Sequence, residues 1–323
     1  MTHAPAEKLL AEYQSLTTGC GSVEFDHWST ISLTGTDRIS FVHNMCTNDV
    51  RRLATGDGCE TFFTDVKGRI VAHVFALALE EELLLITVPQ QAATMINHLD
   101  RYIIREDVQL RDDSDTSCWL LVSGAQAPAR LNAWTDCNTA LLEAPWQHTP
   151  CTIGATEILL VRFQAIWSEG FLLRYAKSDR RHLQHLAEVA CSTSAWNVLR
   201  IESALPLFGI DFDSTNLPQE VDRNDQAISF NKGCYLGQET IARIDALGHV
   251  NQRLTSLRFS DGEVPPRGTK LFSAGKEAGE VTSSCWSPRL DAPLALAMAR
   301  RGSHDPGSLL QSKFGQATVL TLP

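Results

Sequence analysis

Hydrophobic and polar positions follow two periods along the chain, and each period predicts its own elements. Apolar residues at helical spacing predict a short surface helix over residues 6–16. Further along, strands and helices are predicted in the order βαβββαβ, with helices after Asp37 and Pro89 and strands at 31–34, 60–64, 69–79, 83–88 and 108–110. This order is typical of an antiparallel sheet with helices on one face.

A second unit of similar size is predicted to begin near Ser114. Its pattern predicts a further α+β arrangement, with strands at 118–122, 157–163 and 170–175 and helices at 128–134 and 179–190. A helix over 195–205 follows and ends at Pro206, which cannot continue it. The pattern so far indicates two sheet-containing units in succession.

The remaining chain shows a different pattern of apolar and turn residues. The segment from Phe208 to Asn231 has little periodicity, yet it is too apolar for a disordered linker, so we expect it to pack against a site. From Leu254 onward, short β-type runs between turn signals predict a small antiparallel barrel or sandwich. The chain therefore divides into four predicted parts, at residues 1–112, 113–194, 195–250 and 251–323.

Composition and charge narrow the class of protein. A length of 323 residues is too great for one compact core, and a net charge of -10 argues against sequence-blind nucleic-acid binding. The most apolar stretch, residues 71–88, is interrupted by His73 and by glutamates 80–82, so it does not predict a membrane span. The N-terminus lacks the pattern of a signal peptide, so we expect a cytoplasmic protein.

Nine cysteines are scattered along the chain, and none are spaced as C-x-x-C. The sequence therefore predicts no zinc or iron–sulfur site with local ligand spacing, and an odd set of thiols fits a reducing compartment. The densest chemical cluster is Lys232–Glu239, followed by Arg243. Nearby cations lower a thiol's pKa below its usual value of about 8.5, which makes Cys234 the candidate reactive thiol. The alternative is a glycine-rich turn before a helix at 238–244, with Cys234 merely buried.

The segment Lys232–Glu239, Lys-Gly-Cys-Tyr-Leu-Gly-Gln-Glu, resembles the signature of the YgfZ family of folate-binding proteins, which are relatives of the glycine-cleavage T-protein. Other matching pieces follow in the same order between residues 23 and 323: Leu33–Asp37, Cys46–Val50, Lys67–Ile70, Arg200–Pro206, Leu217–Glu220 and Gly279–Ser283. The resemblance implies a three-domain, T-protein-like ring around a folate channel. Its parts would be two α+β, ferredoxin-like units and a C-terminal antiparallel β-barrel.

The resemblance also implies a cofactor and partners. The cofactor would be tetrahydrofolate or a one-carbon derivative of it. The partners would be iron–sulfur enzymes or cluster-assembly proteins, including radical enzymes that modify tRNA, with no direct contact to nucleic acid or membrane. Trp28 and Trp196 stand where YgfZ-type proteins place tryptophans against folate, and an indole stacks well on a flat pterin. The alternative is that both are core residues.

Three charged residues complete the candidate folate site. Glu202 matches the glutamate that reads the pterin's donor edge in T-proteins, and its alternative is an ion pair with Arg200 or Arg243. Lys232 and Arg243 are candidates for the anionic glutamyl tail of folate, and a structural ion pair is the alternative for each.

One departure from the T-protein pattern bears on the reaction. T-proteins carry an aspartate pair shortly after the segment that matches Lys67–Ile70, whereas this chain has Ala72 and His73 there. The loss argues against glycine cleavage and against sarcosine-type demethylation. Three hypotheses remain: a folate-binding protein that supports iron–sulfur enzymes, a folate-dependent aminomethyl- or methyltransferase, and a non-catalytic scaffold with a vestigial folate site. In the first, Cys234 acts as a nucleophile towards a folate-borne carbon, or as a redox group or ligand for a partner.

Overall fold

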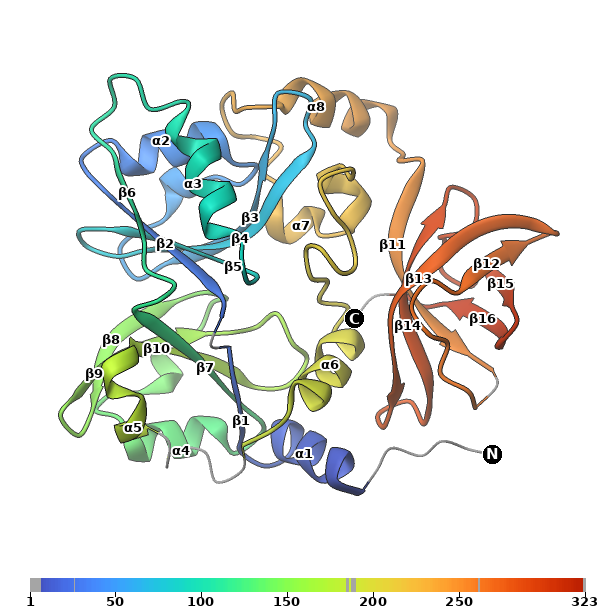
Figure 1. Ribbon diagram of the computed structural model, residues 1–323, viewed down its shortest axis with the longest axis horizontal. Helices are drawn as coiled ribbons and strands as arrows, with labels where there is room; N and C mark the ends of the chain where they lie inside the picture. The colour runs from blue at the N-terminus through green and yellow to red at the C-terminus, as the bar shows by residue number, and fades with distance from the viewer. Residues whose placement is uncertain (1–6, 26, 184–185, 187–189, 261, 322–323) are drawn as a thin grey trace.

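The computed structural model describes residues 7–25, 27–183, 186, 190–260 and 262–321. Two sheets lie one above the other, a barrel stands to their side, and the helices α6 (Thr193–Glu202) and α7 (Asn224–Ala227) lie between them (Figure 1). The helix predicted at 6–16 is confirmed as α1 (Glu7–Thr17). None of the helices within the described ranges is long and apolar enough to cross a membrane.

The first sheet confirms the predicted order βαβββαβ. Its strands pair antiparallel in the order β3-β4-β5-β2-β6, with bounds β2 (Ser29–Thr34), β3 (Gly58–Thr64), β4 (Ile70–Ala78), β5 (Leu83–Thr87) and β6 (Gln109–Asp112). The helices α2 (Arg38–Met45) and α3 (Ala92–Asp100) pack on one face, and a 3-10 turn, η1 (Val50–Arg52), follows α2. Local periodicity and turn signals sufficed here, even for the four-residue strand β6.

The second sheet includes two strands that the sequence analysis missed, its edge strands β1 (Gly21–Glu24) and β8 (His148–Ile153). Its order is β1-β7-β10-β9-β8, with bounds β7 (Ser117–Ser123), β9 (Thr156–Arg162) and β10 (Gly170–Ala176). Strand β1 pairs with β7 across almost one hundred residues of sequence, so the chain contributes a strand from its first residues to the second sheet.

The helices of the second unit are short. They are α4 (Ala127–Trp134), η2 (Thr139–Leu141), η3 (Lys177–Asp179) and α5 (Arg180–Leu183). Of the helix predicted at 179–190, residues 180–183 are helical, whereas 184–185 and 187–189 lie outside the described residues.

The two sheets pack face to face through an aromatic core. On β4, Val74 points into the helix-covered core, whereas Phe75 points towards the second sheet. On β7, Trp119 faces the first sheet, whereas Leu120 packs beneath the second sheet's own helices. Both strands are therefore buried on two faces, which explains their nearly continuous hydrophobic sequences.

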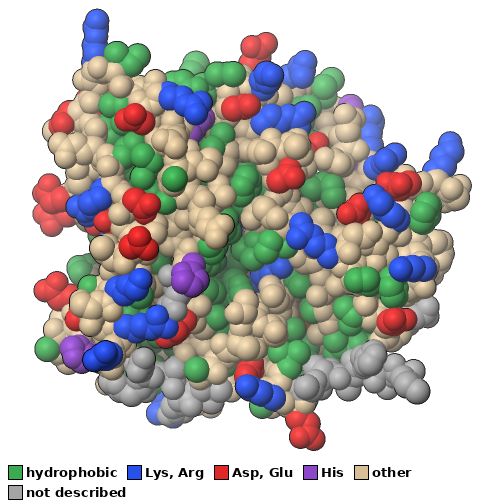
Figure 2. Space-filling view, in the orientation of Figure 1, with side chains coloured by type: hydrophobic (Ala, Val, Ile, Leu, Met, Phe, Trp, Pro, Cys, Tyr) green, Lys and Arg blue, Asp and Glu red, His purple; other side chains and the backbone are tan. Residues whose placement is uncertain are grey.

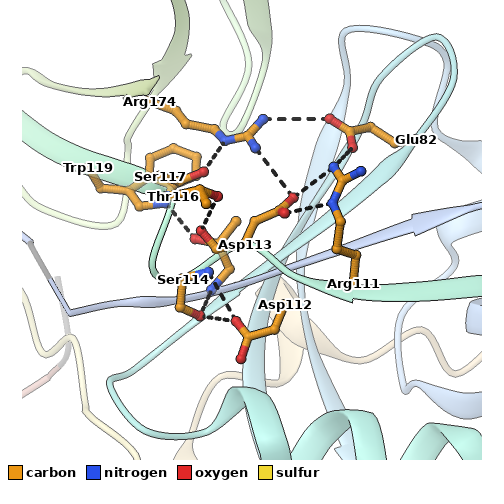
Figure 3. Close-up of polar contacts among 10 residues, drawn as sticks. Glu82, Arg111, Asp112, Asp113, Ser114, Thr116, Ser117, Trp119 and Arg174 are labelled. Atoms are coloured by element: carbon orange, nitrogen blue, oxygen red, sulfur yellow. Dashed lines mark hydrogen bonds and ion pairs between the residues drawn. The ribbon is translucent and has the colours of Figure 1, made fainter. Parts of the chain in front are cut away.

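A network of charged side chains fastens the edges of the two sheets (Figure 3). Arg111 on β6 donates to both carboxylate oxygens of Asp113, at 2.7 and 3.0 Å. Arg174 on β10 lies 3.6 Å from Asp113 and 3.5 Å from Glu82, and its Nε donates to Ser117. Burial would raise the pKa of Asp113, but the two arginines outweigh it and hold that pKa below its usual value. The junction is thus an ion-pair cluster beside an apolar core.

The predicted C-terminal barrel is confirmed. It is closed and six-stranded, in the order β11-β14-β13-β12-β15-β16, with bounds β11 (Gln252–Phe259), β12 (Lys270–Ser273), β13 (Lys276–Ser287), β14 (Ala292–Arg300), β15 (Leu309–Ser312) and β16 (Gly315–Val319). Helix α6 reaches it through Arg200, which ion-pairs with Asp211 at 2.9 Å and donates to Ser283.

The segment between α6 and the barrel is packed, as predicted. It contains η4 (Pro218–Val221), α7 and α8 (Gln238–Leu247). Phe212, Val221 and Ile228 are buried in one cluster with Phe62 and Ile70 of the first sheet. The segment therefore belongs to the first unit's surface rather than to a linker.

Candidate functional site

The loop that carries Cys234 is fastened to the first unit at three points. Leu236 donates its amide to the carbonyl of Asn44 and accepts from the Thr64 hydroxyl at 2.6 Å. Gly237 has φ +81°, and a Cβ there would lie 2.4 Å from the Asp65 carbonyl oxygen, so only glycine allows this approach. The second glycine of the signature is thus required by docking onto the β3–β4 turn.

Lys232 supplies the third anchor. Its side chain is buried and donates to the carbonyl oxygens of His43, Cys46 and Asn48 at 2.6, 2.7 and 2.7 Å. An ammonium has three protons, and each has an acceptor here. The structure therefore places Lys232 where it ties the signature loop to the end of α2, with no proton left for a folate tail.

Replacing Lys232 with methionine is expected to destabilise the protein by about 3 kcal/mol, because the change leaves three buried carbonyl groups without their donor. Urea unfolding measures the loss. Lys67→Met, on the exposed β3–β4 turn, is the matched control and is expected to be neutral. Equal stability of the two variants would contradict the anchor.

Cys234 is exposed, and its neighbour in the chain, Gly233, lies near a histidine–carboxylate pair. The adjacent Gly233 lies close to His43, since a Cβ on Gly233 would be 3.9 Å from His43 Nε2. On its other side His43 Nδ1 lies 3.1 Å from Asp49 Oδ1, without the alignment of a hydrogen bond. Burial, then Lys232 and Arg51, lower the pKa of His43, and Asp49 opposes them in part. The lowered pKa keeps the imidazole of His43 neutral at neutral pH, which is the form that can accept a proton, while burial disfavours the imidazolium that would result.

Trp28 and Trp196 meet in one core rather than in separate ones. Both are buried, and both contact Phe25: its ring stacks on Trp28 with centroids 4.6 Å apart and meets Trp196 edge-on at 5.1 Å. Phe75 stacks beyond Trp28 at 6.2 Å. The structure thus brings the two predicted tryptophans together around Phe25, so a pterin between the indoles would have to displace that ring.

Glu202 is buried with four protein donors. One carboxylate oxygen accepts from the Tyr13 hydroxyl at 2.7 Å and from Trp167 Nε1 at 3.1 Å. The other accepts from the Ser287 hydroxyl at 2.5 Å and from the Arg289 amide at 3.2 Å. A carboxylate offers about four acceptor sites, so none is left for a pterin in this conformation. Burial and Glu202 together raise the pKa of Tyr13 well above its usual value.

Arg243 lies on the exposed side of α8, and within the described ranges it makes no ion pair. Of the two cations predicted for the folate tail, it is therefore the one with a free guanidinium. Trp167 was missed by the sequence analysis. Its indole is 38% exposed, and the Arg289 guanidinium lies 4.8 Å from its ring centroid. An exposed tryptophan is unusual, but nothing in a single sequence indicates exposure.

A closed ion-pair network lies where the sequence analysis placed the missing aspartate. Ala72 is fully buried, and His73 Nε2 lies 2.7 Å from Glu60 Oε1 on the neighbouring strand β3. Arg223 grips the same carboxylate through two nitrogens, each at 2.5 Å. Burial alone would raise the pKa of Glu60, but Arg223 and then His73 outweigh it and bring the value to about 2. Such a carboxylate is ionised at neutral pH and has no proton to give.

The family follows from the match along the chain. Residues 3–232 match the model of the GCVT N-terminal domain, and residues 252–322 match that of the glycine cleavage T-protein C-terminal barrel domain. The chain belongs to the glycine-cleavage T-protein family. A solved T-protein homologue, the glycine cleavage system aminomethyltransferase T of Bartonella henselae, shares the fold with a TM-score of 0.82 and 18% identity, over 98% of this chain and 89% of its own.

Curated relatives are distant but nearly collinear with this T-protein family member. A protein of Arabidopsis thaliana named as a chloroplastic transferase, At1g60990, is 27% identical over 81% of this chain, which spans 61% of that protein's length. Aminomethyltransferases of Bacillus licheniformis and Thermosipho melanesiensis are each 25% identical, over 90% and 94% of this chain and 82% and 85% of theirs. The predicted relation to T-proteins is therefore confirmed, whereas the YgfZ-type assignment stays a prediction.

Proposed function

We propose that this T-protein family member binds tetrahydrofolate, or a one-carbon derivative of it, and supports the assembly or repair of iron–sulfur enzymes in the cytoplasm, including radical enzymes that modify tRNA. The observation that carries the proposal is a contrast between two places in the first unit. His73, at the position that the sequence comparison assigns to the family's aspartate, is paired with Glu60, whereas Cys234 stands exposed on an anchored loop. In this proposal the chain uses the thiol and does without the catalytic acid.

The folate would lie in the central hollow. Figure 2 shows a depression at the centre of this face, with hydrophobic side chains on its wall. A flat, polarisable pterin stacks well on indoles, and we assign its stacking to Trp28 and Trp196, which are buried around Phe25, so that binding requires Phe25 to move aside. Arg243 is the cation that we assign to the glutamyl tail. Glu202 and Lys232 act by holding α6 and the signature loop in place.

The chemistry of the thiol depends on its proton. In this proposal His43 accepts the proton from Cys234, and the carboxylate of Asp49 stabilises the resulting imidazolium. The thiolate then attacks a folate-borne carbon and displaces the folate nitrogen from it, and that nitrogen takes the proton back from His43; alternatively the thiolate serves as a transient ligand or redox group for a partner enzyme. Both routes need the same exposed sulfur and the same base.

Replacing His43 with glutamine is expected to slow the alkylation of Cys234 by iodoacetamide several-fold at neutral pH, because the base that takes the thiol proton is lost. Mass spectrometry of peptides reports the rate at Cys234 separately, and the half-buried Cys59 is an internal control. At alkaline pH the two proteins are expected to converge. An unchanged rate across the whole pH range would remove His43 from the mechanism.

The proposal is tested in cells that lack the gene. Expression of the chain is expected to restore the activity of an iron–sulfur enzyme, measured relative to the amount of that enzyme. No recovery on expression of folded protein would contradict the proposal.

A second function, folate-dependent aminomethyl or methyl transfer, is favoured by the names of the Bacillus licheniformis and Thermosipho melanesiensis relatives. It requires an acid–base carboxylate near the reactive nitrogen of the folate. Purified protein with tetrahydrofolate and methylamine donors is expected to show no turnover, because the carboxyl of Glu60 is held ionised by Arg223 and His73. Turnover with any donor would favour the transferase.

A further inference from the structure

Two cysteines and an aspartate converge at the far end of the second sheet. Asp136 and Cys137 lie in the turn after α4, and Cys151 lies on β8, the edge strand of that sheet. Their ligand atoms, one carboxylate oxygen and two sulfurs, all lie within 4.8 Å of one another. The sequence analysis expected no site with local spacing, and the fold forms this cluster by pairing a turn with a strand that follows it.

The distances are close to those of a metal site. Cys137 Sγ lies 3.9 Å from Asp136 Oδ1. In a tetrahedral zinc site, with bonds of about 2.0–2.3 Å, neighbouring sulfur and oxygen ligands lie about 3.5–3.8 Å apart. The Cys137–Asp136 pair is therefore within half an ångström of this spacing, and the other pairs, which lie within 4.8 Å, need to close by at most about 1 Å.

The carboxylate is already oriented. Asp136 Oδ1 accepts the backbone amide of Thr152 at 2.7 Å, and Oδ2 accepts the Thr152 hydroxyl at 3.1 Å. Hydrogen bonds of this kind orient carboxylate ligands in metal sites. They also fix Asp136 next to the residue that follows Cys151, so turn and strand present their ligands together.

The cluster opens onto a cavity that has room for a fourth ligand. A cavity of about 980 Å³ is lined by Asp136 and Cys151 and extends to the ion-pair network of Figure 3. Arg111 and Arg174 line it too, but both ion-pair with Asp113 and Glu82. The two arginines are thus neutralised by carboxylates at the other end of the cavity. The two sulfurs and the carboxylate of the cluster are free to bind an external cation.

We propose that Asp136, Cys137 and Cys151 bind one thiophilic divalent cation of the zinc type, with water from the cavity as the fourth ligand. Two sulfurs and one oxygen select a borderline-soft metal over magnesium or calcium, which prefer oxygen alone. The bound cation joins the turn after α4 to the edge strand β8 and stabilises the second unit. This site is separate from the folate proposal and does not depend on it.

Cobalt(II) is the probe, added to the full-length protein under reducing conditions that contain no competing thiol. One equivalent is expected to produce thiolate-to-cobalt charge-transfer absorption and the strong visible bands of tetrahedral cobalt, and zinc is expected to displace both. Cys137→Ser and Cys151→Ala are expected to abolish the signal. Asp136→Asn, which keeps both sulfurs, is expected to weaken binding, and Cys234→Ser, which removes the exposed thiol elsewhere, is the matched control and keeps it.

Absence of the absorption in the wild-type protein would overturn the proposal, as would its persistence in Cys137→Ser. Cys137 is half-buried, so this variant stays informative even where Cys151→Ala fails to fold. The two sulfurs lie within 4.8 Å of each other, so a disulfide between them is the alternative to a metal site. The metal site would equally be overturned if peptide mapping finds a disulfide between Cys137 and Cys151 and the reduced protein does not bind cobalt.

Discussion

Replacing Glu60 with glutamine is expected to lower the free energy of unfolding by about 3–5 kcal/mol, because the change leaves the nearly buried guanidinium of Arg223 without its counter-charge. His73 loses its partner in the same step. Urea unfolding, followed by tryptophan fluorescence, measures the effect.

A second substitution provides the control for Glu60→Gln. Adding Arg223→Met removes the orphaned charge, so the double variant is expected to be more stable than Glu60→Gln alone. A Glu60→Gln variant within about 1 kcal/mol of the wild type would show that the network contributes little beyond ordinary hydrogen bonds.

The same network predicts how stability depends on pH. The folded pKa of Glu60 is depressed from 4.5 to about 2, so its contribution is complete above pH 4.5 and is lost as the pH falls towards 2. The contribution amounts to roughly 3 kcal/mol, since one pKa unit corresponds to about 1.4 kcal/mol. Other depressed carboxyls, such as Asp113, give slopes in the same direction. The difference between wild type and Glu60→Gln isolates the part that belongs to Glu60.

Replacing Cys234 with alanine is expected to abolish the support of iron–sulfur enzymes in cells while leaving the fold unchanged. The side chain is exposed, so its loss removes a reactive sulfur and almost no packing. The assay is the activity of an iron–sulfur enzyme in cells that lack the gene and express either the variant or the wild type.

The control for Cys234→Ala is Cys59→Ala, which removes a half-buried thiol from the same unit and is expected to retain full support. Tetrahydrofolate binding by Cys234→Ala is expected to match the wild type, since no folate contact is assigned to the sulfur. Complete rescue by Cys234→Ala would exclude the thiol from the mechanism and leave the folate site to be explained alone.

Local pattern predicted most of the fold because most elements are long. The first sheet and the barrel follow from periodicity and turns within short windows of sequence. Strand β1 could not be found this way, since its four residues are identified as a strand only by their pairing with β7. Contacts between distant segments are the part of a fold that a single sequence reveals least.

The candidate site shows the same limit at the level of single residues. Glu202 was predicted to bind folate because it matches a T-protein glutamate, and Lys232 because a cation suits the anionic folate tail. Their partners lie far away in sequence, with 189 residues between Glu202 and Tyr13 and between Lys232 and His43. The sequence indicated that these residues matter, but it could not distinguish a ligand contact from a structural anchor.

The central claim is that this T-protein family member binds folate, and isothermal titration of the purified protein with reduced tetrahydrofolate tests it most directly. We predict saturable binding with a dissociation constant well below millimolar. A fragment that carries only the aminobenzoyl-glutamate half should bind far more weakly, because the pterin supplies the stacking. No heat of binding at near-millimolar tetrahydrofolate would contradict the account and favour a scaffold with a vestigial site.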